Sequence, residues 1–284
     1  MKVNLMIIGA QKCGTSTLFK ILDTHPAIAG SKPKELNFFN LTKDWRRDLP
    51  SYEKHFEQGE NKLYVEASPS YTFFPGAQSQ SAFDQRYPIR RFHIWDDIYE
   101  YNPDTKFIYL VRDPVDRIVS SYVHHFNRRF TTLGIEEAVL KDRLFLDATR
   151  YFTQINPYVK KFGRENVLII DFEEFIRDKK SVVESVSHFL GLDPNLYSDY
   201  ESAHFNAASE NEWIHHKLDR FEAHLSPLRK IAPSIYSKYV GRKTIPKPKL
   251  SADFEKMIRT LLEVEMRELG RLMGKDLSKW MLAY

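Results

Sequence analysis

Near its N-terminus the chain reads Ile7-Ile8-Gly9-Ala10-Gln11-Lys12-Cys13-Gly14-Thr15-Ser16-Thr17-Leu18. The run from Val3 to Ile8 is almost entirely apolar and rich in β-branched residues, which is typical of a buried strand. A helical spacing of apolar residues resumes at Leu18, after the Ser/Thr cluster. The stretch therefore predicts a strand that stops at Gly9, a tight loop and a helix.

A loop of this kind suits an anion. It points successive backbone N–H groups and the positive end of a helix dipole at one place, where phosphate or sulfate oxygens are held. Gly9 and Gly14 fit because a chain that wraps an anion needs positive φ or a close backbone approach. Their spacing is that of a P-loop, but the lysine stands at Lys12 instead of directly after Gly14, so a magnesium-nucleotide site lacks its usual lysine. An ordinary strand-to-helix turn with a polar N-cap is the alternative.

The length and composition of the chain are those of one large α/β domain. The 284 residues are 42% hydrophobic, enough for a substantial core, and we expect a single domain over residues 1–284. The net charge of +4 is compatible with an anionic nucleotide or an acidic substrate but too small to indicate nucleic acid. No apolar run approaches the roughly 18 residues of a membrane span, and Met1-Lys2 leads straight into the first strand. We therefore expect no membrane span, no cleavable signal and a cytoplasmic location.

A second strand-to-helix transition reads Phe107-Ile108-Tyr109-Leu110-Val111-Arg112-Asp113-Pro114. The apolar run has the length of a strand in the middle of a parallel sheet that is covered on both faces. Asp113-Pro114 then opens a helix with an acidic N-cap and a proline at its first position. Arg112 ends the strand and Ser120 follows about two helical turns later, so we expect both to face one anion. The alternative for Arg112 is an ion pair at the helix start with Asp113 or Asp116, a role for which Arg117 is the better candidate.

The sequence gives little indication of a metal site or of a reactive thiol. Cys13 is the only cysteine, which excludes an intrachain disulfide and a cysteine zinc cluster. A small residue tolerated beside a ligand is a better interpretation of Cys13 than a reactive thiol. His124 and His125 are adjacent and point to different faces of a helix, so we expect no metal site.

The first loop resembles the phosphosulfate-binding loop of the sulfotransferases that use 3′-phosphoadenosine 5′-phosphosulfate (PAPS). The positions that fall on the family pattern are Gly9, Lys12, Gly14, Thr15, Ser16 and Leu18. The second motif is similar to the family's Arg-[Asp/Asn]-Pro-x-[Asp/Glu]-Arg-x-x-Ser-x-Tyr, whose arginine and serine hold the 3′-phosphate. The resemblance implies a three-layer α/β/α fold with a central, mostly parallel sheet, the P-loop NTPase-like sulfotransferase fold.

The resemblance also implies roles for single residues. Lys34-Glu35-Leu36-Asn37-Phe38-Phe39 matches a Lys-Glu-x-x-Phe-Phe segment whose glutamate is the base toward the acceptor, so Glu35 and Lys12 are the predicted catalytic residues. A solvated Glu35 paired with Lys34 or Lys32 is the alternative. The segment Glu66-Ala67-Ser68-Pro69-Ser70-Tyr71 departs from the family, because many members carry lysine where this chain has alanine. The predicted cofactor-binding residues are Gln11, Lys12, Cys13, Gly14, Thr15, Ser16, Thr17, Arg112, Ser120, Tyr151, Arg242 and Lys243.

The remaining segments supply further elements. Strands are predicted over residues 63–66 and 166–171, and residues 73–99 are expected to be rich in loops. Helices are predicted over residues 151–162, over 172–191 with a glycine at the end, and over 251–273. The apolar stripe of the last helix is expected to pack on the sheet; its members are Phe254, Ile258, Leu261, Leu262, Met266, Leu269 and Leu272.

The predicted reaction is transfer of the sulfuryl group from PAPS to a hydroxyl, less often an amine, of a carbohydrate, lipid or other small acceptor. PAP (3′-phosphoadenosine 5′-phosphate) is the expected product, and fixed positive groups are expected to stand where a kinase uses magnesium. A P-loop kinase for small molecules is one alternative, and a non-catalytic nucleotide- or sulfated-glycan-binding relative, favoured by Ala67, is the other. The Golgi lumen replaces the cytoplasm if the sequence is part of a longer, anchored protein.

Overall fold

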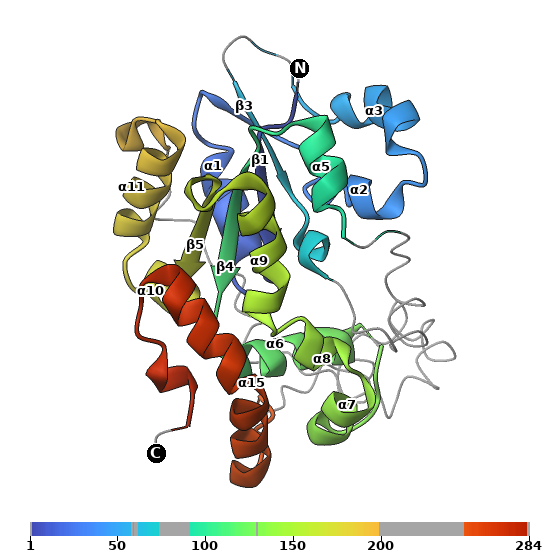
Figure 1. Cartoon of the computed structure of the whole chain (residues 1–284), viewed down its shortest axis with the longest axis vertical. Helices are drawn as coiled ribbons and strands as arrows, with labels where there is room; N and C mark the ends of the chain where they lie inside the picture. Colours follow the sequence, from blue (N-terminus) through green and yellow to red (C-terminus); the bar gives the residue numbers. More distant parts are fainter. Residues whose placement is uncertain are drawn as a thin grey trace, which may run out of the picture.

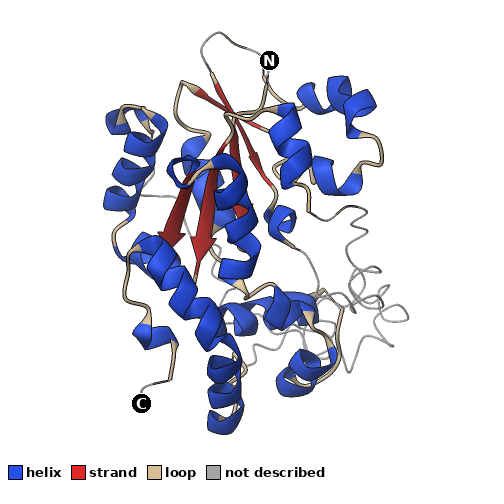
Figure 2. Cartoon of the chain, in the orientation of Figure 1, coloured by secondary structure: helices blue, strands red, loops and turns tan. Residues whose placement is uncertain are grey.

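The computed structural model describes residues 2–57, 59, 62–73, 91, 93–128, 130–198 and 247–282. Its centre is a parallel sheet of five strands in the order β2-β3-β1-β4-β5. The strands are β1 (Leu5–Gly9), β2 (Ile28–Gly30), β3 (Leu63–Ala67), β4 (Lys106–Val111) and β5 (Val167–Asp171). Figure 2 shows the sheet enclosed by helices, and β1, its middle strand, is buried along its whole length.

Helices account for most of the remaining described residues. They are α1 (Thr15–Leu22), α2 (Phe38–Leu41), α3 (Trp45–Glu53), α5 (Trp95–Tyr101), α6 (Pro114–Asn127), α7 (Ile135–Lys141), α8 (Leu144–Asp147), α9 (Tyr151–Phe162), α10 (Phe172–Arg177), α11 (Lys179–Leu190) and α15 (Ala252–Met273). Helix α9 passes in front of the sheet in Figure 1, and α1 lies behind it. The predicted α/β fold with helices on both faces of a parallel sheet is confirmed.

The loop after β1 leaves the sheet at a favourable place. Strand β1 pairs with β3 on one side and with β4 on the other, with Leu5 opposite Val65 and Lys106. The chain turns to β2 on one side first and reaches β4 on the other side later, and ligands of open α/β sheets bind where the strand order reverses in this way. Because all five strands are parallel, the segments that follow them meet at one edge of the sheet.

Several element predictions are confirmed by the structure. The predicted strand and helix around the first loop are β1 and α1, and the second pair is β4 and α6. The side chain of Asp113 accepts hydrogen bonds from the N–H groups of Val115 and Asp116, and Pro114 is the first helical residue, as expected. The predicted start and end of the helix over residues 151–162 agree with α9.

Three predictions about helices were wrong. The helix predicted over residues 172–191 is two helices, because Asp178 leaves helical geometry and its carboxylate caps α11 through the N–H of Ser181. The stripe of α15 packs mainly against α9 and α6, only Met266 and Leu269 of its buried members join the core cluster that contains the sheet, and Leu261 is 50% exposed. Helix α5 begins within residues 73–99, which were expected to be rich in loops and of which residues 74–90 and 92 lie outside the described part of the chain.

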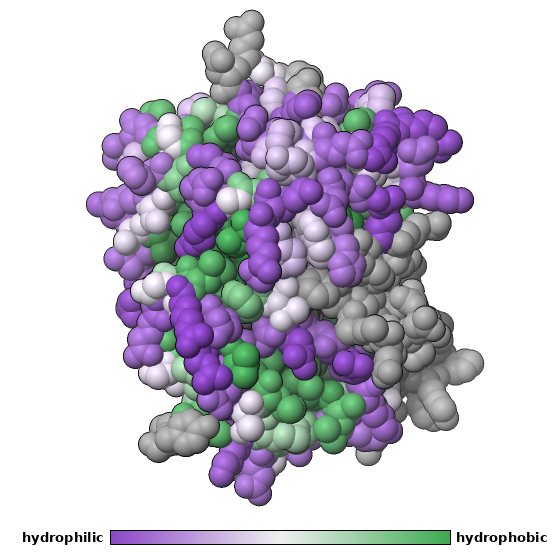
Figure 3. Space-filling view, viewed as in Figure 1, coloured by the Kyte–Doolittle hydropathy of each residue, from purple (hydrophilic) through white to green (hydrophobic). Residues whose placement is uncertain are grey.

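The surface is mostly hydrophilic on the face shown in Figure 3. An apolar area lies low in this view, over α15 and α7, the helices that carry the exposed side chains of Leu140, Leu261 and Val264. Among the described helices, none combines the length and the apolar composition needed to cross a membrane.

Candidate functional site

The loop between β1 and α1 is wrapped tightly at the end of the strand. The N–H of Ala10 donates to the carbonyl of Leu110 on β4 at 2.6 Å, and the N–H of Cys13 donates to Ala10 at 3.2 Å. Gly14 is the N-cap of α1 with φ 87°, and a Cβ added there would lie 2.8 Å from the ring of Phe172. This position therefore requires glycine for both backbone conformation and space.

Lys12 is the centre of a cationic group. Burial lowers the pKa of its ammonium, and the positive charges of Arg112 and Arg128 lower it further. No carboxylate in the described part of the chain forms an ion pair with Lys12 or Arg128. Cationic side chains from the loop and from both ends of α6 thus influence one another, and of these three only Arg112 has carboxylates nearby, in the long ion pairs with Asp116 and Glu173.

Arg112 is held loosely at the end of β4. Its Nε lies 3.8 Å from Glu173 and its Nη2 lies 3.9 Å from Asp116, both too long for hydrogen bonds. The guanidinium lies over the ring of Phe172, 4.8 Å from its centroid. The alternative ion pair with Asp116 at the helix start is therefore present, but it is long, and the buried Nε of Arg112 has no hydrogen-bond partner.

At the start of α6, the close ion pair of Asp113 is formed with a residue that is distant in sequence. Arg259 on α15 donates from Nη1 to Asp113 at 3.0 Å and to the carbonyl of Trp280 at 3.0 Å. Arg117, the predicted partner, is fully buried instead and donates to the carbonyl of Phe145 at 2.8 Å. The prediction for Arg117 was wrong because α6 turns this side chain into the core.

Tyr151 and Cys13 lie behind the loop. Both side chains are fully buried, and the hydroxyl of Tyr151 donates to the carbonyl of Arg112 at 3.0 Å and lies 3.9 Å from the Sγ of Cys13. Burial raises the pKa of the Cys13 thiol to about 12, so it stays protonated. This agrees with Cys13 as a small residue beside the site. Direct contact of Tyr151 with a nucleotide stays a prediction; in the structure its hydroxyl supports Arg112.

Glu35 lies in a segment that is anchored to the same edge of the sheet. The N–H of Asn37 donates to Ser68 Oγ at 2.9 Å, directly after β3. The carboxylate of Glu35 is 52% exposed and 2.8 Å from the ammonium of Lys34, which is the alternative stated for it. An exposed ion pair of this kind is worth about 0–1 kcal/mol, so it exchanges readily for another contact. The role of Glu35 as base stays a prediction.

Where many members of the family carry a lysine, this chain has a buried alanine. Ala67 is fully buried in β3, opposite Ile7 of β1. Next to it, the buried carboxylate of Glu66 accepts hydrogen bonds from the hydroxyls of Tyr52, Ser68 and Tyr71. Burial raises the pKa of Glu66. This part of the motif is structural and provides no cation for the site.

Sequence reasoning missed His124, Arg128 and Glu173. Burial lowers the pKa of His124 to about 3, with contributions from the charges of Lys12 and Arg128, so its imidazole is neutral. Burial and the neighbouring Asp171 raise the pKa of Glu173 to about 7. The spacing Ser120, His124, Arg128 was the available signal for the first two, because residues four apart share one face of a helix.

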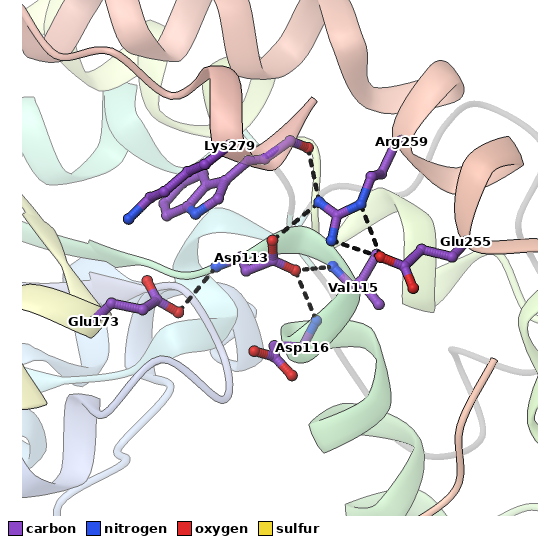
Figure 4. A pocket seen from close by; sticks show the side chains of 8 residues that line it. Asp113, Val115, Asp116, Glu173, Glu255, Arg259 and Lys279 are labelled. Carbon is purple, nitrogen blue, oxygen red and sulfur yellow. Dashed lines mark hydrogen bonds and ion pairs between the residues drawn. The ribbon is translucent and has the colours of Figure 1, made fainter. Parts of the chain in front are cut away.

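A depression of about 380 Å³ lies beside Asp113 (Figure 4), and it shares Asp116 and Glu173 with the ion pairs of Arg112. In Figure 4 the guanidinium of Arg259 points between Asp113 and Glu255, and both carboxylates contact it. The lining residues are Asp113, Val115, Asp116, Glu173, Glu255, Arg259, Lys279 and Trp280. Four carboxylates against two cations make this depression unsuitable for a phosphate, so we do not assign the anion to it.

The remaining predicted cofactor-binding residues lie in the loop, at the start of α1, or outside the described part of the chain. Gln11 and Ser16 are half-buried, and Thr15 and Thr17 are buried at the start of α1. Arg242 and Lys243 lie outside the described residues. Within the described part of the chain, no three His, Cys, Asp or Glu side chains are placed to hold a metal ion.

The fold is that of an α/β protein with a tight, cationic loop at the carboxyl edge of a parallel sheet. The family described as sulfotransferase domain matches residues 2–270. The chain therefore belongs to the sulfotransferase domain family, and the predicted family is confirmed.

Relatives of two kinds are similar to it. Heparan sulfate glucosamine 3-O-sulfotransferase 5 of Mus musculus is 25% identical over 215 residues, covering 71% of this chain and 56% of the relative. Heparan sulfate glucosamine 3-O-sulfotransferase 3B1 of Homo sapiens is 29% identical over 202 residues, covering 66% of this chain and 45% of the relative. The chain thus spans about half the length of these relatives. A solved sulfotransferase from Alicyclobacillus acidocaldarius, with TM-score 0.69, 24% identity and 99% of both chains covered, shows the same fold.

Proposed function

We propose that this protein is a PAPS-dependent sulfotransferase that acts on a hydroxyl, less often an amine, of a carbohydrate, lipid or other small acceptor. The observation that carries the proposal is the cationic group of Lys12, Arg112 and Arg128 beside the loop after β1. The carboxylates nearest to Arg112 stand 3.8 Å and 3.9 Å away, and none of the described residues forms an ion pair with Lys12 or Arg128. A ligand with separate phosphate and phosphosulfate groups supplies the missing negative charge. Membership of the sulfotransferase domain family and the names of the curated relatives support the same reaction.

Different residues would bind the two anionic groups of the donor. The loop amides from Gly9 to Thr17 and the ammonium of Lys12 would hold the 5′-phosphosulfate, because they combine a helix N-terminus with one charge. Arg112 and Ser120 would hold the 3′-phosphate, for which a guanidinium offers a planar fork of donors. PAPS supplies the sulfuryl group when it is bound.

The transfer needs one base and one stabilising cation. Glu35 takes the proton of the acceptor hydroxyl as the acceptor oxygen forms its bond to sulfur. The bond between sulfur and the phosphate oxygen breaks, and Lys12 offsets the negative charge that develops on that oxygen. The products are the sulfated acceptor, PAP and protonated Glu35, which then returns its proton to water.

Calorimetric titration with PAP tests the donor site. We expect wild-type protein to bind PAP and Arg112→Ala to bind it about 10- to 100-fold more weakly, since a charge-assisted contact is lost. Arg47→Ala is the matched control, because Arg47 is 78% exposed on α3 and its only ion pair within the described part of the chain is with Asp48. If the protein binds magnesium-ATP and the 3′-phosphate of PAP does not increase affinity, the proposal is contradicted and a P-loop kinase is favoured.

A second measurement tests turnover. With PAPS and a panel of hydroxyl acceptors, wild-type protein is expected to release PAP, and Glu35→Gln is expected to bind PAP normally while losing most of this release. PAP binding without release for any acceptor would favour the non-catalytic relative. Full activity in Glu35→Gln would leave the reaction in place and remove Glu35 as the base.

A further inference from the structure

Glu173 lies beside Arg112 because two neighbouring strands end together. Strand β4 pairs with β5, and Val111 lies opposite Asp171, so the residues that follow these two strands are neighbours. Helix α10 begins directly after β5, and the side chain of Asp171 caps it by accepting a hydrogen bond from the N–H of Glu173 at 2.9 Å. This cap fixes the backbone of Glu173 next to the end of β4.

One carboxyl oxygen of Glu173 faces two groups of the segment after β4. Its Oε1 accepts a hydrogen bond from the backbone N–H of Asp113 at 3.3 Å, drawn as a dashed line in Figure 4. The same oxygen lies 3.8 Å from the Nε of Arg112. The second distance is too long for a hydrogen bond, but a movement of about 1 Å would close it. Glu173 is thus already held where it can accept a hydrogen bond from Arg112.

Each partner has a polar atom without a hydrogen bond. The Nε of Arg112 and the Oε2 of Glu173 are both buried, and neither has a hydrogen-bond partner among the described residues. A buried polar atom left unsatisfied costs free energy, so two such atoms side by side require an explanation. A ligand that draws the guanidinium of Arg112 into place, so that its Nε reaches Glu173, provides one.

The surroundings restrict how the guanidinium of Arg112 can turn. It lies over the ring of Phe172, 4.8 Å from the ring centroid. A bond from Nε to Glu173 would fix its remaining orientation and leave both Nη groups free, as the planar fork that suits a phosphate. Burial and Asp171 raise the pKa of Glu173 to about 7. Below this pH the carboxyl accepts a hydrogen bond without cancelling the charge of Arg112.

We propose that Glu173 is a positioning residue of the donor site: when the 3′-phosphate binds, its carboxyl accepts a hydrogen bond from the Nε of Arg112 and directs the two Nη groups toward the phosphate. This inference rests on the proposed function and adds a residue from another strand end that acts through Arg112. Glu173 itself does not touch the donor. Its removal therefore weakens recognition of the 3′-phosphate alone, and only while Arg112 is present.

Two nucleotides that differ by the 3′-phosphate test the inference. The protein is titrated with PAP and with 5′-AMP at pH 6, and the Kd for AMP divided by the Kd for PAP reports the contacts of the 3′-phosphate. We expect Glu173→Leu and Glu173→Ala, which lack the acceptor, to reduce this ratio about tenfold, as the loss of one hydrogen bond to a charged group allows. Glu173→Gln keeps an acceptor oxygen and is uncharged, like most of the wild-type carboxyl at this pH, so it should keep most of the ratio. Glu184→Leu, at an exposed position of α11, is the control.

A double variant separates positioning from a general structural effect. In protein that carries Arg112→Ala, adding Glu173→Leu should change the Kd for PAP by less than about twofold, because the guanidinium through which Glu173 acts is absent. A clearly weaker double variant overturns the inference.

The single variants can overturn it as well. They do so if the ratio is unchanged in Glu173→Leu and Glu173→Ala, if AMP affinity falls as much as PAP affinity, or if Glu173→Gln loses as much as Glu173→Leu. Tighter binding of PAP by Glu173→Leu also overturns it, because Glu173 would then compete with the phosphate for Arg112. Failure of the wild-type protein to bind PAP more tightly than AMP contradicts the proposed function instead, and this comparison is made first.

Discussion

The hydroxyl of Tyr151 at the start of α9 donates a hydrogen bond to the backbone carbonyl of Arg112 at 3.0 Å. Arg112 follows the last residue of β4, so this bond ties the helix in front of the sheet to the strand end that carries the guanidinium proposed to bind the 3′-phosphate. Tyr151 is fully buried and therefore acts on the position of Arg112 from within the core.

Tyr151→Phe should weaken the donor site without removing it. The variant leaves the carbonyl of Arg112 without this donor, and the loss of one hydrogen bond costs about 1 kcal/mol of unfolding free energy. We expect PAP affinity to fall by less than tenfold, measured by calorimetry, with a small decrease in the urea midpoint. A fall as large as that of Arg112→Ala would indicate that Tyr151 contacts the nucleotide directly.

Donor binding should weaken at alkaline pH. The pKa of Lys12 lies below the ordinary lysine value, chiefly because of burial, and the bound anion favours the charged ammonium. As pH rises through the lowered pKa, free protein loses the proton that binding requires, so the Kd for PAP increases. Lys12→Arg is the control, since a guanidinium stays charged, and an equal pH dependence in both proteins would contradict this explanation.

Glu173→Gln should change how stability depends on pH. Burial and Asp171 raise the pKa of Glu173 to about 7 in the folded protein, above the ordinary value of about 4.3. The stability that the protonated carboxyl contributes is complete below about pH 4 and is lost as pH rises to about 7. The free energy of unfolding of the variant, relative to that of wild type, should therefore increase as the pH rises from 5 to 8, as measured by urea unfolding. The exposed Glu184→Gln should show no such trend.

Lys275→Ala should destabilise the fold. The ammonium of Lys275 lies 2.5 Å from Asp171 and 2.7 Å from Glu174, and the carboxylate of Asp171 is fully buried. Removing the lysine leaves a buried negative charge with a weaker partner, which we expect to cost about 2 kcal/mol or more. Lys279, 3.9 Å from the same carboxylate, provides the control, and its replacement by alanine should cost clearly less in the same unfolding assay.

Cys13 should be unreactive in the native protein. Its side chain is fully buried and its pKa is about 12, so neither access nor thiolate is available at neutral pH. Ellman's reagent is expected to release no chromophore from folded protein and one equivalent after unfolding in guanidinium. Rapid labelling of folded protein would show that the loop opens far more than the structure indicates.

The sequence determined the elements that depend on neighbouring residues. The β-branched run before Gly9 and the Asp113-Pro114 helix start each encode their structure within a few positions, because burial pattern and capping are local. The motif spacings led to the sulfotransferase family, which the match over residues 2–270 confirms. The same local logic missed the cap at Asp178, which divides a helical pattern that looked continuous.

Only the tertiary structure decided which side chains meet. Spacing shows that Ser120, His124 and Arg128 share a face of α6, but not that this face is the exposed one or that the charge of Lys12 influences His124 on it. The rotation of a helix about its axis is set by the packing of its buried residues, and that packing involves segments far apart in the chain. For the same reason the partner of Asp113 is Arg259, on a helix that the sequence alone placed against the sheet.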